Sequence, residues 1–92
     1  MRKVTAQIKA AFEAQTPRTV GNTSTDGQSV WLHCNKIVER RENGEVWATL
    51  AGWATPTTRE RVNGITGLRF HQVSHESMLD GRPADPSEWF KA

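Results

Sequence analysis

The chain has a single cysteine, no tyrosine and no long apolar run among its 92 residues. One cysteine, Cys34, cannot form an internal disulfide, so packing and hydrogen bonds must hold the fold. The opening MRKVTAQIKAAFEAQ interrupts its apolar residues too often for the core of a secretory signal. No segment approaches the roughly 20 apolar residues of a membrane-spanning helix. These absences predict a cytoplasmic protein.

Neither sign of charge dominates, because 12 basic and 10 acidic residues leave a net charge of +2. This charge is too small for a protein that coats DNA without specificity, and it has the wrong sign for a protein that imitates DNA with carboxylates. Basic residues prevail in the first twenty positions, and acidic residues gather after Glu76. For a chain of this mass, one standard interface would cover roughly 15% of the surface, so binding could be its whole task.

Residue patterns of catalytic and metal sites are missing. The sequence has no C-x-x-C and no H-E-x-x-H, and the adjacent His33 and Cys34 would point to opposite faces of a strand. Glu39, Glu42 and Glu45 surround one turn between arginines, which is typical of a solvated hairpin tip. We therefore expect no enzyme, no cofactor and no metal site.

Hydrophobic periodicity predicts a helix over residues 4–15. Val4, Ile8, Ala11 and Phe12 form one helical stripe, and Pro17 ends the helix no later than Thr16.

The next section is rich in turn signals. Asp26-Gly27 and Asn43-Gly44 are type I′ hairpin signals, and a tight turn is expected around Cys34-Asn35. Between these turns lie short alternating runs in which Val30 and Leu32 share one strand face and Trp31 lies on the other. This pattern predicts an antiparallel meander of about four to six strands, although the register of KIVERR stays ambiguous.

A second short helix is expected near residue 57, before the last hairpin. Thr55 can cap a helix that has Pro56 at its first position, or Thr57 and Glu60 can form a capping box. Val62 and Ile65 would face inward, and Gly64 or Gly67 would end the helix. The segment RPADPSEWFKA is predicted to be irregular, with Trp89 and Phe90 packing back. The prediction is a single α+β domain over residues 1–92.

Basic side chains are the first candidates for a binding role. Those on the predicted hairpins, second helix and following strand are Lys36, Arg40, Arg41, Arg59, Arg61 and Arg69. A second basic patch on the first helix would comprise Arg2, Lys3 and Lys9. Alternatively, Arg59, Glu60 and Arg61 form an ordinary solvated helix face whose charges compensate one another.

Four tryptophans are many for a chain of this length. Exposed tryptophans could stack bases or anchor a protein interface. Core filling is the favoured interpretation for Trp47 and Trp53, while Trp31 is balanced between core and surface.

The segments RTVGNTSTDGQSVWLHCNKIVE and AGWATPTTRERVNGITGLRFHQ resemble a group of small phage-encoded proteins. The shared pattern runs N-T-x-T-D-G, L-H-G-N-x-I and G-W-x-T-x-T-T-R-x-R-[LIV]-N, and it covers roughly residues 18–82. Cys34 departs from it, because the pattern has glycine before Asn35. A type I′ turn there needs positive φ, which costs cysteine more than glycine, so we expect another turn type.

The chain also resembles small anti-CRISPR proteins directed at the type I-F (Csy) surveillance complex. This resemblance implies a stoichiometric inhibitor in the host cytoplasm, with Cas protein subunits as partners and guide RNA as a further contact. It would block target DNA by occupancy and would carry no catalytic residues. Two rivals stay open: a phage protein that binds nucleic acid or modulates transcription, and a small virion or host-takeover adaptor.

Overall fold

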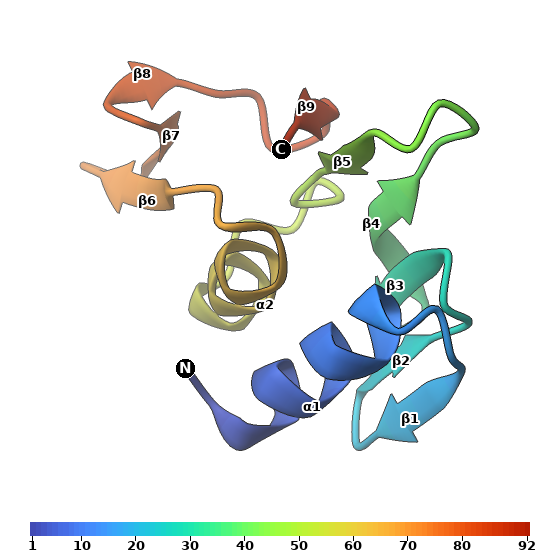
Figure 1. Cartoon of the computed structure of the whole chain (residues 1–92). Helices are drawn as coiled ribbons and strands as arrows, with labels where there is room; N and C mark the ends of the chain where they lie inside the picture. The colour runs from blue at the N-terminus through green and yellow to red at the C-terminus, as the bar shows by residue number, and fades with distance from the viewer.

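The computed structural model describes residues 1–92 and contains two helices, α1 (Lys3–Glu13) and α2 (Pro56–Thr66), beside two antiparallel sheets (Figure 1). The larger sheet contains, in spatial order, β1 (Arg18–Val20), β2 (Thr23–Thr25), β3 (Ser29–Leu32), β4 (Asn35–Arg40), β5 (Val46–Ala48) and β9 (Phe90–Lys91). The smaller sheet contains β6 (Phe70–Val73), β7 (Glu76–Leu79) and β8 (Arg82–Pro83). This arrangement confirms the predicted α+β class. No helix is both long and apolar enough to cross a bilayer.

Helix α1 confirms the predicted apolar stripe, because Ile8, Ala11 and Phe12 are buried. The helix ends at Glu13, two residues before the predicted end at residue 15. Gln15 adopts a left-handed conformation with φ 56°, and the N–H of Thr16 donates to the carbonyl oxygen of Ala11 at 2.9 Å. This pattern of bonds is a common helix terminus, and it turns the chain into β1 before Pro17 would have blocked the helix.

Helix α2 starts by the first of the two predicted routes. The Thr55 hydroxyl accepts a hydrogen bond from the N–H of Thr58 at 3.1 Å, with Pro56 at the first helical position. The Thr57–Glu60 capping box is not formed, because the Glu60 carboxylate binds α1 instead. Gly67 ends the helix with φ 80°, and Val62 and Ile65 face the core as predicted.

The two helices pack on one side of the larger sheet (Figure 1). The core fills the space between the helices and the sheet. Its buried hydrophobic residues come from both helices, from β3 to β6 and from the segments that follow β5 and β8; among them are Ile8, Val30, Val38, Leu50 and Val62. A register shift between Val30 and Trp31 lets β4 bury two adjacent residues, Ile37 and Val38. This β-bulge is the irregularity behind the ambiguous register of KIVERR.

The turns at Asp26-Gly27 and Asn43-Gly44 are not of the predicted type. Gly27 and Gly44 have positive φ, but Asp26 and Asn43 do not, so neither turn is type I′. The Asp26 carboxylate accepts hydrogen bonds from the N–H groups of Gln28 and Ser29, both at 2.8 Å, and these bonds lower its pKa. Side-chain bonding has replaced the expected mirror-image turn.

The turn between β3 and β4 lies one residue earlier than expected. His33 and Cys34 both have positive φ, 49° and 68°, and Leu32 pairs with Asn35 across the hairpin. This is a type I′ turn without glycine, so the expectation of another turn type was wrong. The surrounding hairpin holds Cys34 in a conformation that costs a side-chain-bearing residue about 1–2 kcal/mol.

The C-terminal segment is more regular than predicted. Residues of β9 pair with β5, through Trp47 with Lys91 and Ala48 with Phe90. The Phe90 ring meets Phe70 edge to face with centroids 5.6 Å apart, so the predicted return of Phe90 to the core is confirmed.

Candidate binding site

Arg61, predicted on a binding surface, is buried with only 4% of its surface exposed. Its Nε donates to the Thr23 hydroxyl at 3.1 Å, and its Nη1 donates to the Thr5 hydroxyl at 3.0 Å and to the Glu60 carboxylate. Helix periodicity directs position 61 toward α1 and β2, between which the guanidinium lies. Arg61 therefore joins three elements of the fold and offers no surface to a partner.

Glu60 completes this buried network. Burial raises the pKa of its carboxyl, but hydrogen bonds from the Thr5 hydroxyl, the Arg2 N–H and Arg61, with the charge of Arg61, together lower the pKa below its ordinary value. The carboxylate thus stays ionised and neutralises the buried guanidinium, as a stable buried charge requires.

Two further predicted arginines are engaged by backbone carbonyl groups. Arg40 donates to the carbonyl oxygens of Gly27 at 2.6 Å and Phe12 at 3.0 Å, and its guanidinium lies 4.2 Å from the Phe12 ring centroid. A cation at this end of α1 also suits the helix dipole. Arg59 donates to the carbonyl oxygen of Ala54 at 2.8 Å. Arg40 thus ties the end of α1 and the β2–β3 turn to β4, and Arg59 holds the segment before its own helix.

The other predicted cations on the sheets form local pairs. Arg41 binds Glu39 at 3.0 Å and stacks on Trp47, with 4.0 Å to the ring centroid. The exposed Lys36 lies 5.7 Å from the Trp31 ring centroid, and Arg69 pairs with Asp80 at 3.3 Å. On the same sheet face as Trp47, Lys91 binds Glu45 at 2.6 Å and is the main cause that lowers the pKa of Glu45 to about 2.

On α1, the side chains of Arg2 and Lys3 are exposed and Lys9 is half-buried. The predicted basic residues thus lie at separate places, at the start of and within α1, in α2, and in or beside the strands of both sheets. Their part in binding stays a prediction, and only Arg61 is removed from the surface altogether.

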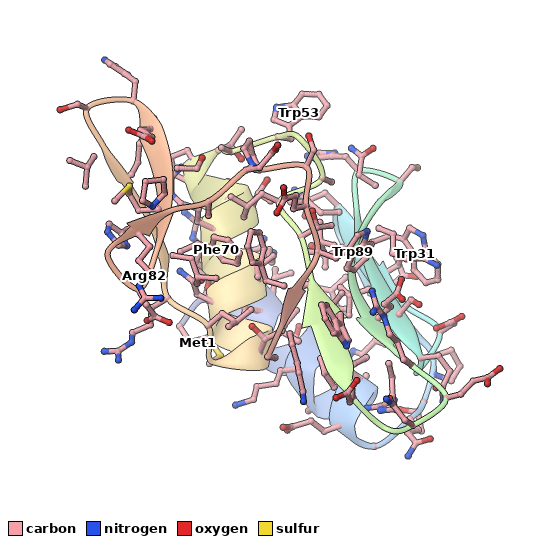
Figure 2. The ribbon with its side chains drawn as sticks, turned by 90° about the horizontal axis from the view of Figure 1, so that it is seen from above. Met1, Trp31, Trp53, Phe70, Arg82 and Trp89 are labelled. Carbon is pink, nitrogen blue, oxygen red and sulfur yellow. The ribbon has the colours of Figure 1, made fainter.

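A cleft of about 290 Å³ opens where the β3–β4 turn meets the segment before α2. Its floor is aliphatic and includes Leu32, Ile37 and Leu50. Trp53 lines the cleft, and 60% of its surface is exposed; Figure 2 shows its ring projecting from the loop that precedes α2. The expectation that Trp53 fills the core was wrong, because the preceding turn carries the ring out of it.

Two left-handed turns shape this cleft. His33 belongs to the first, and the second is formed by Ala51, with φ 57°, and Gly52, with φ 72°. The N–H of Trp53 closes the second turn by donating to the carbonyl oxygen of Leu50 at 2.9 Å. The N–H of Gly52 connects this turn to the C-terminal segment by donating to the carbonyl oxygen of Pro86 at 2.8 Å. Strained backbone of this kind, held by its surroundings, is concentrated at binding and catalytic sites in proteins.

The cleft contains no Asp, Glu, Lys or Arg side chain, and several of its polar groups are free. The side-chain amide of Asn35, the hydroxyl of Thr57 and the indole N–H of Trp53 form no hydrogen bond within the chain and contact solvent. Thr58 is instead committed to the cap of α2, since its hydroxyl lies 2.9 Å from that of Thr55. The cleft can therefore offer a flat aromatic surface, an aliphatic floor and neutral hydrogen-bonding groups.

Sequence reasoning missed this cleft because it ranked charged residues first. The available signal was the Ala51-Gly52 turn immediately before Trp53, which predicts that a strand has ended and that the tryptophan lies on a loop. No group of three or more His, Cys, Asp or Glu side chains is placed to hold a metal ion.

The structure is a small α+β domain with a tryptophan-lined cleft that contains no Asp, Glu, Lys or Arg. The chain belongs to the Kyanoviridae Gp96 protein family, a phage family whose model matches residues 1–91. The expected phage origin is thereby confirmed. No curated protein and no solved structure matches the chain.

Proposed function

We propose that this phage protein is a non-catalytic inhibitor that occupies a surface of the host's type I-F Csy complex. In the host cytoplasm it would bind Cas subunits, contact guide RNA through exposed cations such as Lys36, and keep target DNA from pairing. Pairing of guide and target is nearly balanced in free energy and begins at a short seed. An inhibitor therefore needs only to prevent that first step.

The exposed Trp53 beside a cleft is the observation that carries this proposal. Tryptophan is enriched among the few residues that dominate protein interfaces, where it lies in well-packed pockets. A net charge of +2 does not suit imitation of DNA, so the proposed mode is occupation of a protein surface. Accessible surface of 5272 Å² leaves room for one interface of about 800 Å² per partner.

Co-purification and DNA binding test the proposal together. Purified Csy complex is incubated with the protein and separated by size, and the binding of labelled target duplex is then titrated. We expect a stable complex and loss of target binding. Target binding that is unimpaired at saturating protein rejects the proposal.

The matched variants are Trp53→Ala and Val73→Ala. Both side chains are largely exposed, 60% for Trp53 and 52% for Val73, but Val73 lies on β6 away from the cleft. Trp53→Ala should weaken inhibition by at least tenfold, since truncation of a central interface residue costs about 2 kcal/mol or more. Val73→Ala should inhibit like the wild type. Equal inhibition by all three proteins would exclude Trp53 as the anchor.

Binding of bare nucleic acid is the second candidate, favoured by one observation. Trp31 and Trp47 lie on the sheet face opposite the buried Val30 and Val38, each beside a cation, Lys36 or Arg41. Tryptophan rings on a basic surface can stack bases of single strands. A gel shift with single and duplex strands at several salt concentrations separates the candidates, because micromolar binding that falls steeply with salt supports this one.

A further inference from the structure

We propose that the Trp53 cleft binds one uncharged, apolar side chain of a protein partner together with its flanking peptide groups. This inference rests on the proposed function in taking the partner to be a protein. It goes beyond that function because it states which chemical group enters the cleft and which groups the cleft must reject.

The lining of the cleft matches such a side chain. Leu32, Ile37 and Leu50 form the aliphatic floor but are almost fully buried, so the apolar surface open to a ligand comes mainly from Ala51 and the exposed Trp53. Burial of apolar surface from water is favourable by about 25 cal/mol per Å². An aliphatic or aromatic side chain would therefore gain free energy in the cleft, whereas a charged group would lose its hydration without a partner.

Charge complementarity points the same way. The cleft has 10 lining residues, and none is Asp, Glu, Lys or Arg, although these types make up 24% of the chain. Arg59 lies on the helix that borders the cleft, but its guanidinium binds the Ala54 carbonyl oxygen. A phosphate or carboxylate would find no lysine or arginine in the lining, and Nε2 of the one imidazole there, His33, lies 3.3 Å from the Asn22 side-chain amide. This lining disfavours nucleic acid strands and acidic peptides as occupants.

The free polar groups suit a peptide backbone. The Asn35 amide can donate and accept, the Thr57 hydroxyl can do both, and the Trp53 indole donates. Peptide groups on either side of an inserted side chain present one donor and one acceptor each. These groups of the cleft could satisfy them, so that burial of the segment would leave no polar atom unpaired.

The volume suits a small occupant. Pockets for drug-sized ligands span about 300–1,000 Å³, and this cleft holds about 290 Å³. The cleft is also pre-formed, because the Ile37 carbonyl oxygen accepts from the Thr49 N–H at 2.9 Å, the turn at Gly52 is tied to Pro86, and Thr55 caps α2. A rigid cleft avoids part of the ordering cost of binding.

Capped amino acids serve as probes in a titration followed by NMR of the ¹⁵N-labelled protein. The probes are N-acetyl-leucinamide, N-acetyl-glutamic acid amide and uridine, and the reporters are the Trp53 indole N–H and the Asn35 side-chain amide. N-acetyl-leucinamide should shift both reporters with a dissociation constant on the order of 1–10 mM, as its size allows. The glutamic acid probe should bind at least tenfold more weakly. Trp53→Ala, which removes the indole reporter, should abolish the shift of the Asn35 amide, and Val73→Ala should preserve the shifts of both reporters.

Three results overturn the inference. The first is no shift of either reporter up to about 50 mM of the leucine probe, a concentration that covers the weak binding expected of so small a ligand. The others are equal binding of the charged probe and preferential binding of uridine. Each of these results is separable from failure of the proposed function. If the leucine probe binds but the Csy complex still takes up target DNA, the inference on the cleft stands and the inhibitory function falls. If inhibition depends on Trp53 but no probe binds, the function stands and this inference falls.

Discussion

Gly64 lies where α2 touches α1, and its replacement by alanine tests the packing of the two helices. A β-carbon at this position would lie 2.5 Å from Cγ2 of Thr5, whereas carbon atoms in contact prefer about 3.5–4.0 Å. Thr5 is not free to rotate. Its hydroxyl donates to Glu60 Oε1 at 2.5 Å and accepts from Arg61 Nη1 at 3.0 Å, so the new methyl group must force the helices apart.

Two opposing effects set the magnitude. Alanine is favoured over glycine inside a helix by about 1 kcal/mol, and overpacking of a tight contact costs about 1–3 kcal/mol. We expect Gly64→Ala to lower the free energy of unfolding by about 1 kcal/mol in the wild-type background. Thr5→Ser keeps the hydroxyl and removes Cγ2. In the Thr5→Ser background, Gly64→Ala should therefore raise the free energy of unfolding by about 1 kcal/mol. The coupling between the two positions is then about 2 kcal/mol.

Urea unfolding of the four proteins of this cycle, followed by tryptophan fluorescence and circular dichroism, measures the coupling. The slope of unfolding free energy on urea must stay constant for the values to be compared. A gain in stability from Gly64→Ala alone, or a coupling below about 0.5 kcal/mol, would refute the argument that Thr5 is held in place by the Arg61 network.

The remaining predictions concern charge and strain. Arg61→Met should lower the free energy of unfolding by about 1–3 kcal/mol, because it leaves the buried hydroxyls of Thr5 and Thr23 without this donor and the partly buried Glu60 without its cation; urea unfolding measures the loss, and a loss below about 1 kcal/mol contradicts the network. The pKa of Glu60 is lowered on folding from its ordinary value of 4.5, so its contribution is complete above that pH and is lost as pH falls through the folded pKa. The melting temperature, measured between about pH 2 and pH 7, should thus fall less steeply with decreasing pH for Glu60→Gln than for the wild type. Parallel curves of melting temperature against pH would contradict this linkage. Cys34→Gly should raise the free energy of unfolding by about 0.5–1 kcal/mol, since the relief of a left-handed residue exceeds the entropy cost of glycine; a lower melting temperature would show that Cys34 makes contacts that matter.

Helices were the most predictable part of this fold. The spacing of Ile8, Ala11 and Phe12 and the combination of Thr55, Pro56 and Gly67 are signals whose parts lie within one or two helical turns. Both helices occur where these signals place them. Hairpin positions were also largely predictable, but turn types were not, because Asp26 and Asn43 side chains bond to nearby backbone N–H groups and change the local geometry.

The candidate site was much less predictable. Arg59 and Arg61 were both predicted to bind a partner, yet one binds a carbonyl oxygen near its own helix and the other is buried. Trp47 and Trp53 were both interpreted as core, but Trp47 lies half-buried on the sheet face away from the core. Trp53 is exposed because the Ala51-Gly52 turn directs it outward. Burial of a side chain depends on which elements come to lie over it, and that is not a property of the side chain's own neighbours in sequence.

By itself, the sequence of this protein determined an α+β domain with two short helices, a meander of short strands, and a net charge too small to coat DNA and of the wrong sign to imitate it. Each of these properties depends on composition or on patterns of a few residues. Tertiary structure alone decided which basic side chains are buried, where the neutral cleft opens and that Trp53 lines it. The physical reason is that these outcomes require partners far apart in the chain, such as Arg61 with Thr23 and Thr5, which are 38 and 56 residues away.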